Sequence, residues 1–261
     1  MKRKSGINVD CINRDRPFDN LKAIKEAGFE SFFTLCYDDF TLQKLVDGAK
    51  EYGLDFEFIH SPWKNINSIW TDENPEILTE ILKSITKAGE YGIEGVIVHL
   101  SSGYTPPEIC DLGLRQVDLI VETAKKCGVK VAFENIRKVG NIAYIFDRYE
   151  KEDHVGFCYD CGHEHCYTDN DVSMLDLFGK RTIYTHIHDN FGISKNGDAD
   201  LHMLPFEGDI DYKKMIEKLD KYNYTGSLVL EVLPNNSNFK DEELMKEAYK
   251  RFLRIQELSN N

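Results

Sequence analysis

Six side chains of the types that ligate metal ions recur along the chain, each near the end of a short β-branched or aromatic segment. They are His60, His99, Glu134, Asp160, His186 and Glu231. If the fold brings the ends of these segments together, the carboxylates among them repel one another unless a cation lies between them. The residue types and their spacing therefore predict a site for a divalent metal ion.

The segments that carry these residues alternate with amphipathic stretches, which predicts repeated βαβ units. We place strands at residues 6–10, 30–34, 54–60, 95–100, 129–134, 155–160, 182–188 and 227–232. Eight such units in 261 residues match a single-domain (β/α)₈ TIM barrel over residues 1–261, with its active site at the C-terminal ends of the strands. An open doubly wound sheet is the alternative fold, but residues 6–11 lack its typical G-x-G-x-x-G turn.

Helix boundaries are marked by their own residues. Glycines suited to a left-handed C-cap end four of the predicted helices, at Gly28, Gly53, Gly92 and Gly128. The pair Asn74-Pro75 predicts an N-cap followed by proline at the first helical position. Apolar stripes predict the buried faces of two helices: Leu78, Ile81, Leu82 and Ile85 in one, and Leu244, Ala248, Phe252 and Ile255 in the last, after Asp241.

Alternation along the strands predicts which side chains face the barrel interior. Glu134 points inward if Phe133 packs outward against the helices, and Glu231 points inward if Leu230 packs outward. Cys158 has the inward parity of Asp160, so we expect it to fill the interior. Two glutamates therefore face each other across the predicted mouth.

Composition limits the functions to consider. The chain has 32 Lys and Arg against 45 Asp and Glu, a net charge of −13, which disfavours nucleic acids and anionic membranes as partners. The chain has no run of about 18 apolar residues, so no membrane span is predicted. The N-terminal residues do not resemble a secretory signal. The seven cysteines, an odd number, suit reduced thiols. We therefore expect a soluble cytoplasmic protein, with a homo-oligomer left open.

Four motifs together resemble a known family. They are Phe133-Glu134-Asn135, Asp160-Cys161-Gly162-His163, His186-Ile187-His188-Asp189 and Leu230-Glu231-Val232. The chain resembles, over nearly its whole length, the xylose isomerase-like barrels, which include sugar isomerases, ketose 3-epimerases, inosose dehydratases and zinc-dependent apurinic-site endonucleases. Each motif alone is weak, and their combination is specific.

The resemblance implies the roles of the site residues. It makes Glu134, Asp160, His186 and Glu231 the ligands of one divalent ion (Mn²⁺, Co²⁺, Mg²⁺ or Zn²⁺), and it implies no organic cofactor. It also implies that Glu134 and Glu231 exchange a proton on a sugar, phosphorylated or not, through a metal-stabilised enediolate. The side chains that we expect near this small-molecule substrate are His60, Trp63, His99, His163, His188, Asp200 and His202.

Other functions remain open at this point. Residues 200–209 resemble the D-x-H…G-x-G loop of the family, with Asp209 in place of the second glycine. In the endonuclease branch, the positions matching five residues hold two further zinc ions: His60, His99, His163, Asp200 and His202. A zinc phosphodiesterase acting on abasic DNA is therefore the main rival, although the net charge of −13 opposes it. An inosose-type dehydratase and a non-catalytic sugar or metal sensor are further alternatives.

Two smaller features also have alternative explanations. The spacing of Cys158, Cys161 and Cys166 is compatible with a structural zinc site, although no second pair of ligands lies at finger-like spacing. Arg137 and Lys138, just after Glu134, are candidates for an acidic group on the substrate, or for a solvated start of a helix.

Overall fold

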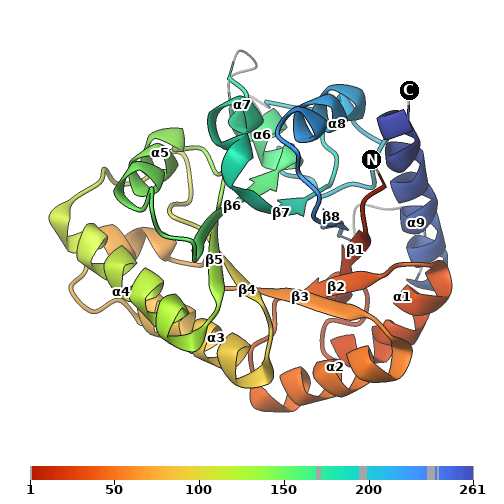
Figure 1. The fold of residues 1–261 in the computed structure, drawn as a ribbon, viewed down its shortest axis with the longest axis horizontal. Coiled ribbons are helices and arrows are strands. Elements are labelled where there is room, and N and C mark those ends of the chain that lie inside the picture. The colour runs from red at the N-terminus through yellow and green to blue at the C-terminus, as the bar shows by residue number, and fades with distance from the viewer. Residues whose placement is uncertain (1, 169–171, 194–198, 234–238, 240, 261) are drawn as a thin grey trace.

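Eight parallel strands surround a central axis, and helices enclose them on the outside (Figure 1). The structure is a computed structural model that describes residues 2–168, 172–193, 199–233, 239 and 241–260. The strands are β1 (Ser5–Asn8), β2 (Ser31–Thr34), β3 (Asp55–His60), β4 (Gly95–Val98), β5 (Lys130–Glu134), β6 (Val155–Asp160), β7 (Thr182–His186) and β8 (Leu228–Leu230).

The sheet nearly closes on itself. Its hydrogen-bonded order is β7-β6-β5-β4-β3-β2-β1-β8, and an isolated bridge between Ile187 and Leu230 joins β7 to β8 at the remaining gap. This is the single-domain TIM barrel that the alternation of strands and helices predicts. Because all strands run the same way, their C-terminal ends meet at one mouth.

The helices follow the strands in chain order. They are α1 (Leu21–Ala27), α2 (Asp39–Tyr52), α3 (Glu76–Tyr91), α4 (Asp111–Cys127), α5 (Val139–Arg148), α6 (Cys161–Tyr167), α7 (Met174–Phe178), α8 (Tyr212–Lys221) and α9 (Asp241–Glu257). Gly28, Gly53, Gly92 and Gly128 end four of them with positive φ, as predicted. After β7 the chain runs from Ile187 to Asp211 before α8 begins, and this long connection contributes to the mouth.

Several predicted boundaries shift by one or two residues. The prediction that Pro75 takes the first helical position is wrong, since Pro75 is itself the N-cap of α3 and no side chain caps that helix. The predicted strands also run too far at the mouth: His99 follows β4, His188 follows β7 and Glu231 follows β8. The apolar pattern continues through Leu100, whereas β4 ends at Val98.

The barrel interior beneath the mouth is filled with side chains. Phe33, Phe58, Ile97, Ala132, Cys158, Tyr184 and Val229 form one buried cluster, with one member from each of β2 to β8. The helices pack on the outer face of the sheet through a larger cluster, which includes the predicted residues Leu244, Ala248, Phe252 and Ile255 of α9. The interior cluster gives the mouth an apolar floor.

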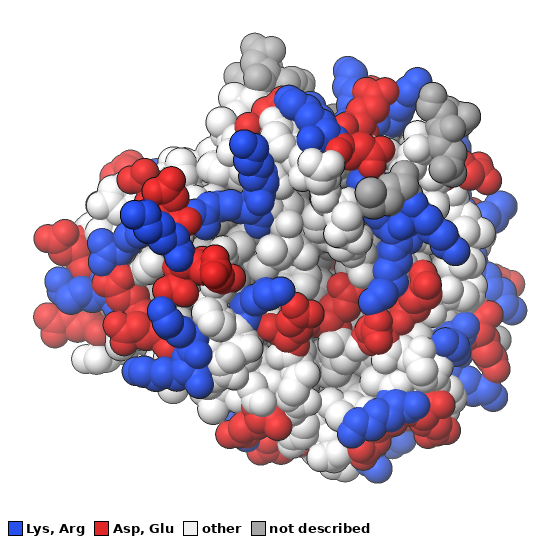
Figure 2. Space-filling model, viewed as in Figure 1, with Lys and Arg blue, Asp and Glu red and all other residues white. Residues whose placement is uncertain are grey.

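The surface around the barrel has mixed charge. On the face drawn in Figure 2, Lys and Arg side chains alternate with Asp and Glu over the ring of helices, and the described residues form no continuous basic stripe there. Within the described part of the chain, none of the helices is both long enough and apolar enough to span a bilayer.

Candidate metal centre

Four ligand-type side chains meet at the bottom of the mouth. Glu134, Asp160, His186 and Glu231, here called the deep group, each offer one ligand atom within 4.8 Å of the others. They come from the ends of β5, β6, β7 and β8. His186 Nδ1 lies 3.1 Å from Glu134 Oε1 and 3.2 Å from Glu231 Oε2. The structure thus brings together the four residues that the sequence singles out.

The floor of the deep group is apolar. The His186 ring stacks on Phe33, with 5.0 Å between ring centroids, and also contacts Phe58. Asp160 Oδ2 is buried and accepts no hydrogen bond from any described residue. A buried carboxylate oxygen without a donor is costly unless a cation lies beside it. Carboxylate and imidazole ligands in this arrangement therefore fit a divalent metal ion.

Glu134 has imidazoles against both of its carboxylate oxygens. Oε1 lies 3.1 Å from Nδ1 of both His163 and His186. Oε2 lies 3.2 Å from His60 Nε2 and 2.9 Å from His99 Nε2. His60, His99 and Glu134 form a second potential ligand set. Glu134 is therefore placed to bridge two neighbouring cation positions.

The contacts of His60 indicate which of its two ring nitrogens carries the proton. Nδ1 lies 2.8 Å from the Ser61 carbonyl oxygen, which can only accept, so Nδ1 carries a proton. In a neutral imidazole Nε2 then presents its lone pair to Glu134 Oε2. That contact needs either a second proton or a cation between the two atoms. A histidine that ligates a metal typically donates its other N–H to a backbone carbonyl in this way.

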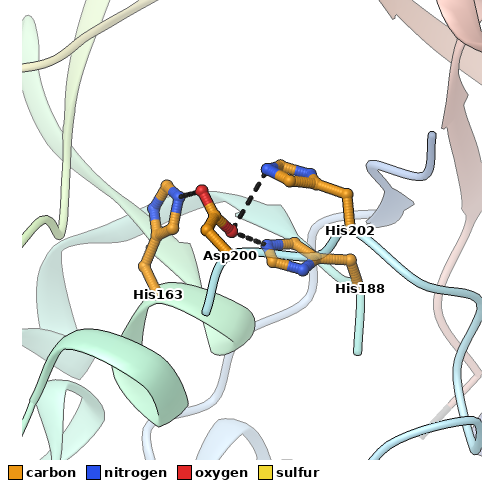
Figure 3. Close-up of side chains that lie close together, drawn as sticks. All are labelled: His163, His188, Asp200 and His202. Carbon is orange, nitrogen blue, oxygen red and sulfur yellow. Dashed lines mark hydrogen bonds and ion pairs between the residues drawn. The ribbon is translucent and has the colours of Figure 1, made fainter. Parts of the chain in front are cut away.

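A second group lies beside the deep group, nearer the rim. His163, His188, Asp200 and His202, here called the outer group, also have ligand atoms within 4.8 Å of one another. Figure 3 shows the Asp200 carboxylate between the three imidazoles. Asp200 lies 3.2 Å from His163 Nε2 and 3.3 Å from His202 Nε2. His188 Nε2 is also 3.2 Å from Asp160 Oδ1, so the two groups are in contact.

His202 repeats the pattern of His60. Its Nδ1 donates to the Glu231 carbonyl at 3.0 Å, and Nε2 faces the Asp200 carboxylate. Its backbone has φ of 46°, the left-handed region that a non-glycine residue adopts at a cost. Stacking on His188, with 3.9 Å between ring centroids, also holds the imidazole in place. Such local strain is typical of functional sites.

The pKa values of the site show how strongly its carboxylates interact with the neighbouring histidines. Burial alone would raise the pKa of Glu134, but His186 and His99 hold it well below its usual value. Burial alone would lower the pKa of His186, yet Glu231 and Glu134 raise it to about 9. The pKa of His202 rises against burial to about 10, through Glu231 and Asp200. The carboxylates thus stabilise positive charge on the neighbouring imidazoles. A metal ion would provide that positive charge equally well.

Several positioning residues escape prediction from sequence. The Asn135 side chain bonds both to the backbone nitrogen and to the backbone oxygen of Asp160, at 2.8 Å each, and so fixes β5 against β6 at the site. The buried Asp189 carboxylate accepts the backbone N–H groups of Phe206 and Ile210, and so holds the connection that carries the outer group. Both residues end motifs quoted in the sequence analysis, Phe133-Glu134-Asn135 and His186-Ile187-His188-Asp189, but the motifs do not indicate these contacts.

Glycine at position 162 allows α6 to approach the outer group. A Cβ atom there would lie 1.9 Å from the His188 ring, so a side chain would displace that imidazole. The D-x-x-H motif thus needs its glycine for packing.

Two other candidate residues lie outside the deep group and the outer group, Trp63 and Cys158. Trp63 is 44% exposed at the mouth, with its ring 5.2 Å from His60 and 5.9 Å from His99 between centroids. Cys158 fills the barrel interior, as its parity predicts. Among the described residues, no potential metal-ligand set contains two cysteines, so the alternative cysteine site gains no support.

Comparison with known proteins identifies the fold family. The model of the xylose isomerase-like TIM barrel family matches residues 21–255. The protein y4fM of Sinorhizobium fredii is 35% identical over 144 residues, which is 55% of this chain and 42% of that protein, so the match spans less than half of its length. The protein MJ1311 of Methanocaldococcus jannaschii is 27% identical over 97% of this chain and 90% of its own. Both are described as uncharacterized.

Solved structures share the whole architecture. A D-tagatose 3-epimerase-like protein superposes with a TM-score of 0.75 at 24% identity, covering 100% of both chains. The IolI protein, whose crystal structure contains a zinc atom, superposes with a TM-score of 0.74 at 18% identity over 98% of both chains. These similarities establish the fold, and the family match covers most of the sequence. The chain belongs to the xylose isomerase-like TIM barrel family.

Proposed function

We propose that this protein is a divalent-metal-dependent isomerase or epimerase that acts on a sugar or a related polyol. The observation that carries the proposal is the exposure of the deep group. The side chains of Glu134, Asp160 and His186 are fully buried, whereas the Glu231 side chain is 11% exposed. One carboxylate of the metal-ligand set can thus touch a substrate in the mouth, and the others remain in the protein.

A divalent ion held by the deep group would stabilise negative charge on a substrate oxygen, and so acidify the neighbouring carbon. Glu231 is the residue placed to take the proton from that carbon. The second oxygen of Glu134 is enclosed by His60 and His99, so a proton reaches Glu134 through an imidazole. Burial lowers the pKa of His99, which favours its neutral form and suits it to relay that proton. Glu134 and Glu231 thus act as the acid/base pair, one directly and one through His99.

The relatives support the substrate class. Solved structures of this fold include a D-tagatose 3-epimerase-like protein and the Escherichia coli 3-keto-D-glucoside 4-epimerase YcjR. Both names refer to epimerisation at a carbon of a sugar.

Metal-dependent hydrolysis of a phosphate ester is the second candidate. The observation that favours it is that two histidines outside the deep group, His60 and His202, direct Nε2 at a carboxylate, that of Glu134 at 3.2 Å and that of Asp200 at 3.3 Å. With ions in all three ligand sets, the site would suit a phosphate group. Abasic DNA is a poor substrate for it, because the net charge of −13 opposes binding of a polyanion.

One experiment separates the two functions. Purified protein would be analysed for metal ions per chain, then incubated in D₂O with a panel of ketoses and, in parallel, with bis-p-nitrophenyl phosphate and an abasic duplex. We expect one tightly held ion and deuterium uptake at a sugar carbon. Hydrolysis of a phosphate ester by protein that holds two or three ions, with no deuterium uptake in any sugar, would overturn the proposal in favour of the second candidate.

A further inference from the structure

The guanidinium of Arg137 is held between two tyrosine rings at the mouth. Its Cζ atom lies 3.6 Å from the ring centroid of Tyr167 and 4.3 Å from that of Tyr104. Arg137 follows β5, Tyr104 lies between β4 and α4, and Tyr167 ends α6. Three separate connections at the C-terminal ends of the strands therefore contribute to one stack.

This stack continues into the candidate metal centre. The Tyr167 ring lies parallel to the His163 ring, at 21° and 5.1 Å between centroids. His163 in turn lies 3.1 Å from Glu134 and 3.2 Å from Asp200. A single tyrosine ring thus separates the Arg137 guanidinium from an imidazole that contacts both ligand groups.

The charge of Arg137 is not neutralised by the described part of the chain. No described carboxylate lies within ion-pair distance of it, whereas Arg148 at the other end of α5 pairs with Asp118 at 2.7 Å. The adjacent Lys138 is already engaged by Glu108. The first turn of α5 carries no acidic side chain either. Among the described residues, Arg137 thus has no carboxylate partner, unlike Arg148 and Lys138.

Stacking determines how this guanidinium can bind a ligand. Both rings lie against the guanidinium, so the N–H donors that remain usable are those that point away from the rings. A planar fork of donors matches two oxygens of a phosphate or carboxylate group. The rings also restrict the side chain before a ligand arrives, which lowers the entropy cost of binding.

We propose that Arg137, held by Tyr104 and Tyr167, binds an oxyanion group of the substrate, either a phosphate ester or a carboxylate. Resting on the proposed function, this makes the substrate a sugar phosphate or a sugar acid and not a neutral sugar. The metal centre then handles the hydroxyl and carbonyl end of the molecule, while Arg137 fixes its anionic end.

The test measures binding and needs no turnover. Glycerol 3-phosphate, D-glycerate and uncharged glycerol would be titrated by NMR into wild-type protein and variants, in both metal-free and Mn²⁺-loaded forms. Arg137→Gln removes the charge, and Arg137→Lys keeps the charge without the planar fork. Arg254→Gln is the matched control, because Arg254 also stacks on an aromatic ring, that of Phe206 at 3.8 Å, in the last turn of α9.

We expect Arg137→Gln to weaken binding of at least one anion by about tenfold or more in both forms of the protein. The anion affinity of Arg137→Lys should lie between that of Arg137→Gln and that of the wild type. Arg254→Gln should bind the anions as tightly as the wild type does. Glycerol should be unaffected throughout. A loss confined to glycerol 3-phosphate identifies a phosphate ester as the natural group, and a loss confined to D-glycerate identifies a carboxylate.

Two results would overturn the inference. One is wild-type protein that binds neither anion, and the other is an Arg137→Gln variant that binds both anions as tightly as the wild type. If Arg137→Gln fails to fold, Tyr104→Ala decides, since Tyr104 is 74% exposed and its loss should leave the fold intact. Unchanged anion affinity in Tyr104→Ala then counts against the stack. Because these measurements need no reaction, a failure of the isomerase proposal leaves their outcome readable.

Discussion

The deep group and the outer group contain the same kinds of side chain but are positioned by different parts of the chain. The ligands of the deep group stand at or directly after the ends of β5 to β8, where neighbouring strands fix their backbones. In the outer group, His163 lies in α6, and Asp200 and His202 belong to the long connection after β7. One group is thus set by the sheet, and the other by loops that the sheet carries.

The two groups also differ in their access to solvent. Three of the four deep side chains are fully buried, whereas Asp200 and His202 are 17% and 15% exposed. A ligand set on strands keeps its geometry when loops change, while a set on loops can adapt to the substrate. The deep group should therefore be required for any activity. The outer group should determine which substrate is used and how fast it is turned over.

The largest expected effect follows from Glu134→Gln. The variant keeps the shape of the side chain but removes the negative charge at the centre of four imidazoles. We expect turnover to fall by about a thousandfold or more, because a general base and an anionic ligand are lost together. Steady-state kinetics and metal content of the purified variant check this.

Glu57→Gln is the matched control for this change. Glu57 lies on β3 three residues before His60, nearer the closed end of the barrel, and burial raises the pKa of its carboxyl. We expect metal content and turnover as in the wild type. Near-normal rates in Glu134→Gln, or an equal loss in both variants, would contradict the division between the deep group and the rest of the barrel.

Removal of the metal should match the loss in Glu134→Gln. Chelation should inactivate the protein, and Mn²⁺, Co²⁺, Mg²⁺ or Zn²⁺ should restore activity better than Ca²⁺, since mixed nitrogen and oxygen ligands suit the smaller ions. The restored ion should also raise the melting temperature, because it binds only the folded state. Full activity after exhaustive chelation, with metal analysis at background, would contradict the proposal that the deep group holds a metal ion needed for activity.

The strands and the deep group could be predicted from sequence because their signals are local. Glu134 and Asp160 each end an apolar run, and a barrel places all such ends at one mouth. The predicted strand ends near His99 and Glu231 were too long because apolar residues continue past the point where backbone pairing stops. Alternation of side chains reports burial, and it does not report hydrogen bonding between strands.

The contacts between distant segments could not be predicted in this way. Asn135 bonds to Asp160 across 25 positions of sequence, and the stack on Arg137 joins three connections that are far apart along the chain. Each depends on side-chain directions that exist only after the barrel has closed. The same is true of the proton on His60 Nδ1, which follows from one carbonyl oxygen and cannot be read from residue types.

A smaller effect is expected from His202→Ala in the outer group. His202 contacts Asp200, stacks on His188 and lies 3.6 Å from Glu231 Oε2, so its loss should disturb substrate positioning. We expect kcat/KM to fall by about tenfold, with the ion of the deep group retained. His154→Ala is the control, because His154 Nδ1 also bonds to a backbone carbonyl, that of Val129, away from the ligand groups. If His202→Ala loses nearly all activity and also loses a bound ion, the result would favour the hydrolase instead.

The smallest expected effect is on the pH dependence of stability in metal-free protein. The pKa values of His186 and His202 are raised from 6.5 to about 9 and about 10 in the folded state. Folded protein therefore binds more protons than unfolded protein between pH 6.5 and these values. This stabilisation is complete below pH 6.5 and is lost as pH rises through about 9 to 10.

A metal ion in the deep group should remove the contribution of His186, because a ligating imidazole is neutral whatever the pH in this range. The contribution of His202, in the outer group, should remain. The carboxylates of the site do not interfere, since the pKa values of Glu134, Asp160 and Asp200 are lowered and these groups stay ionised above pH 6.5. Urea midpoints measured from pH 6.5 to 9 should fall in the chelated protein and fall less in the Mn²⁺-loaded protein. In His202→Ala the fall should be shallower, because one of the two imidazoles is gone. A chelated wild type whose midpoint does not change over this range would mean that protons do not replace the cation, and that the two groups are not held together by charge.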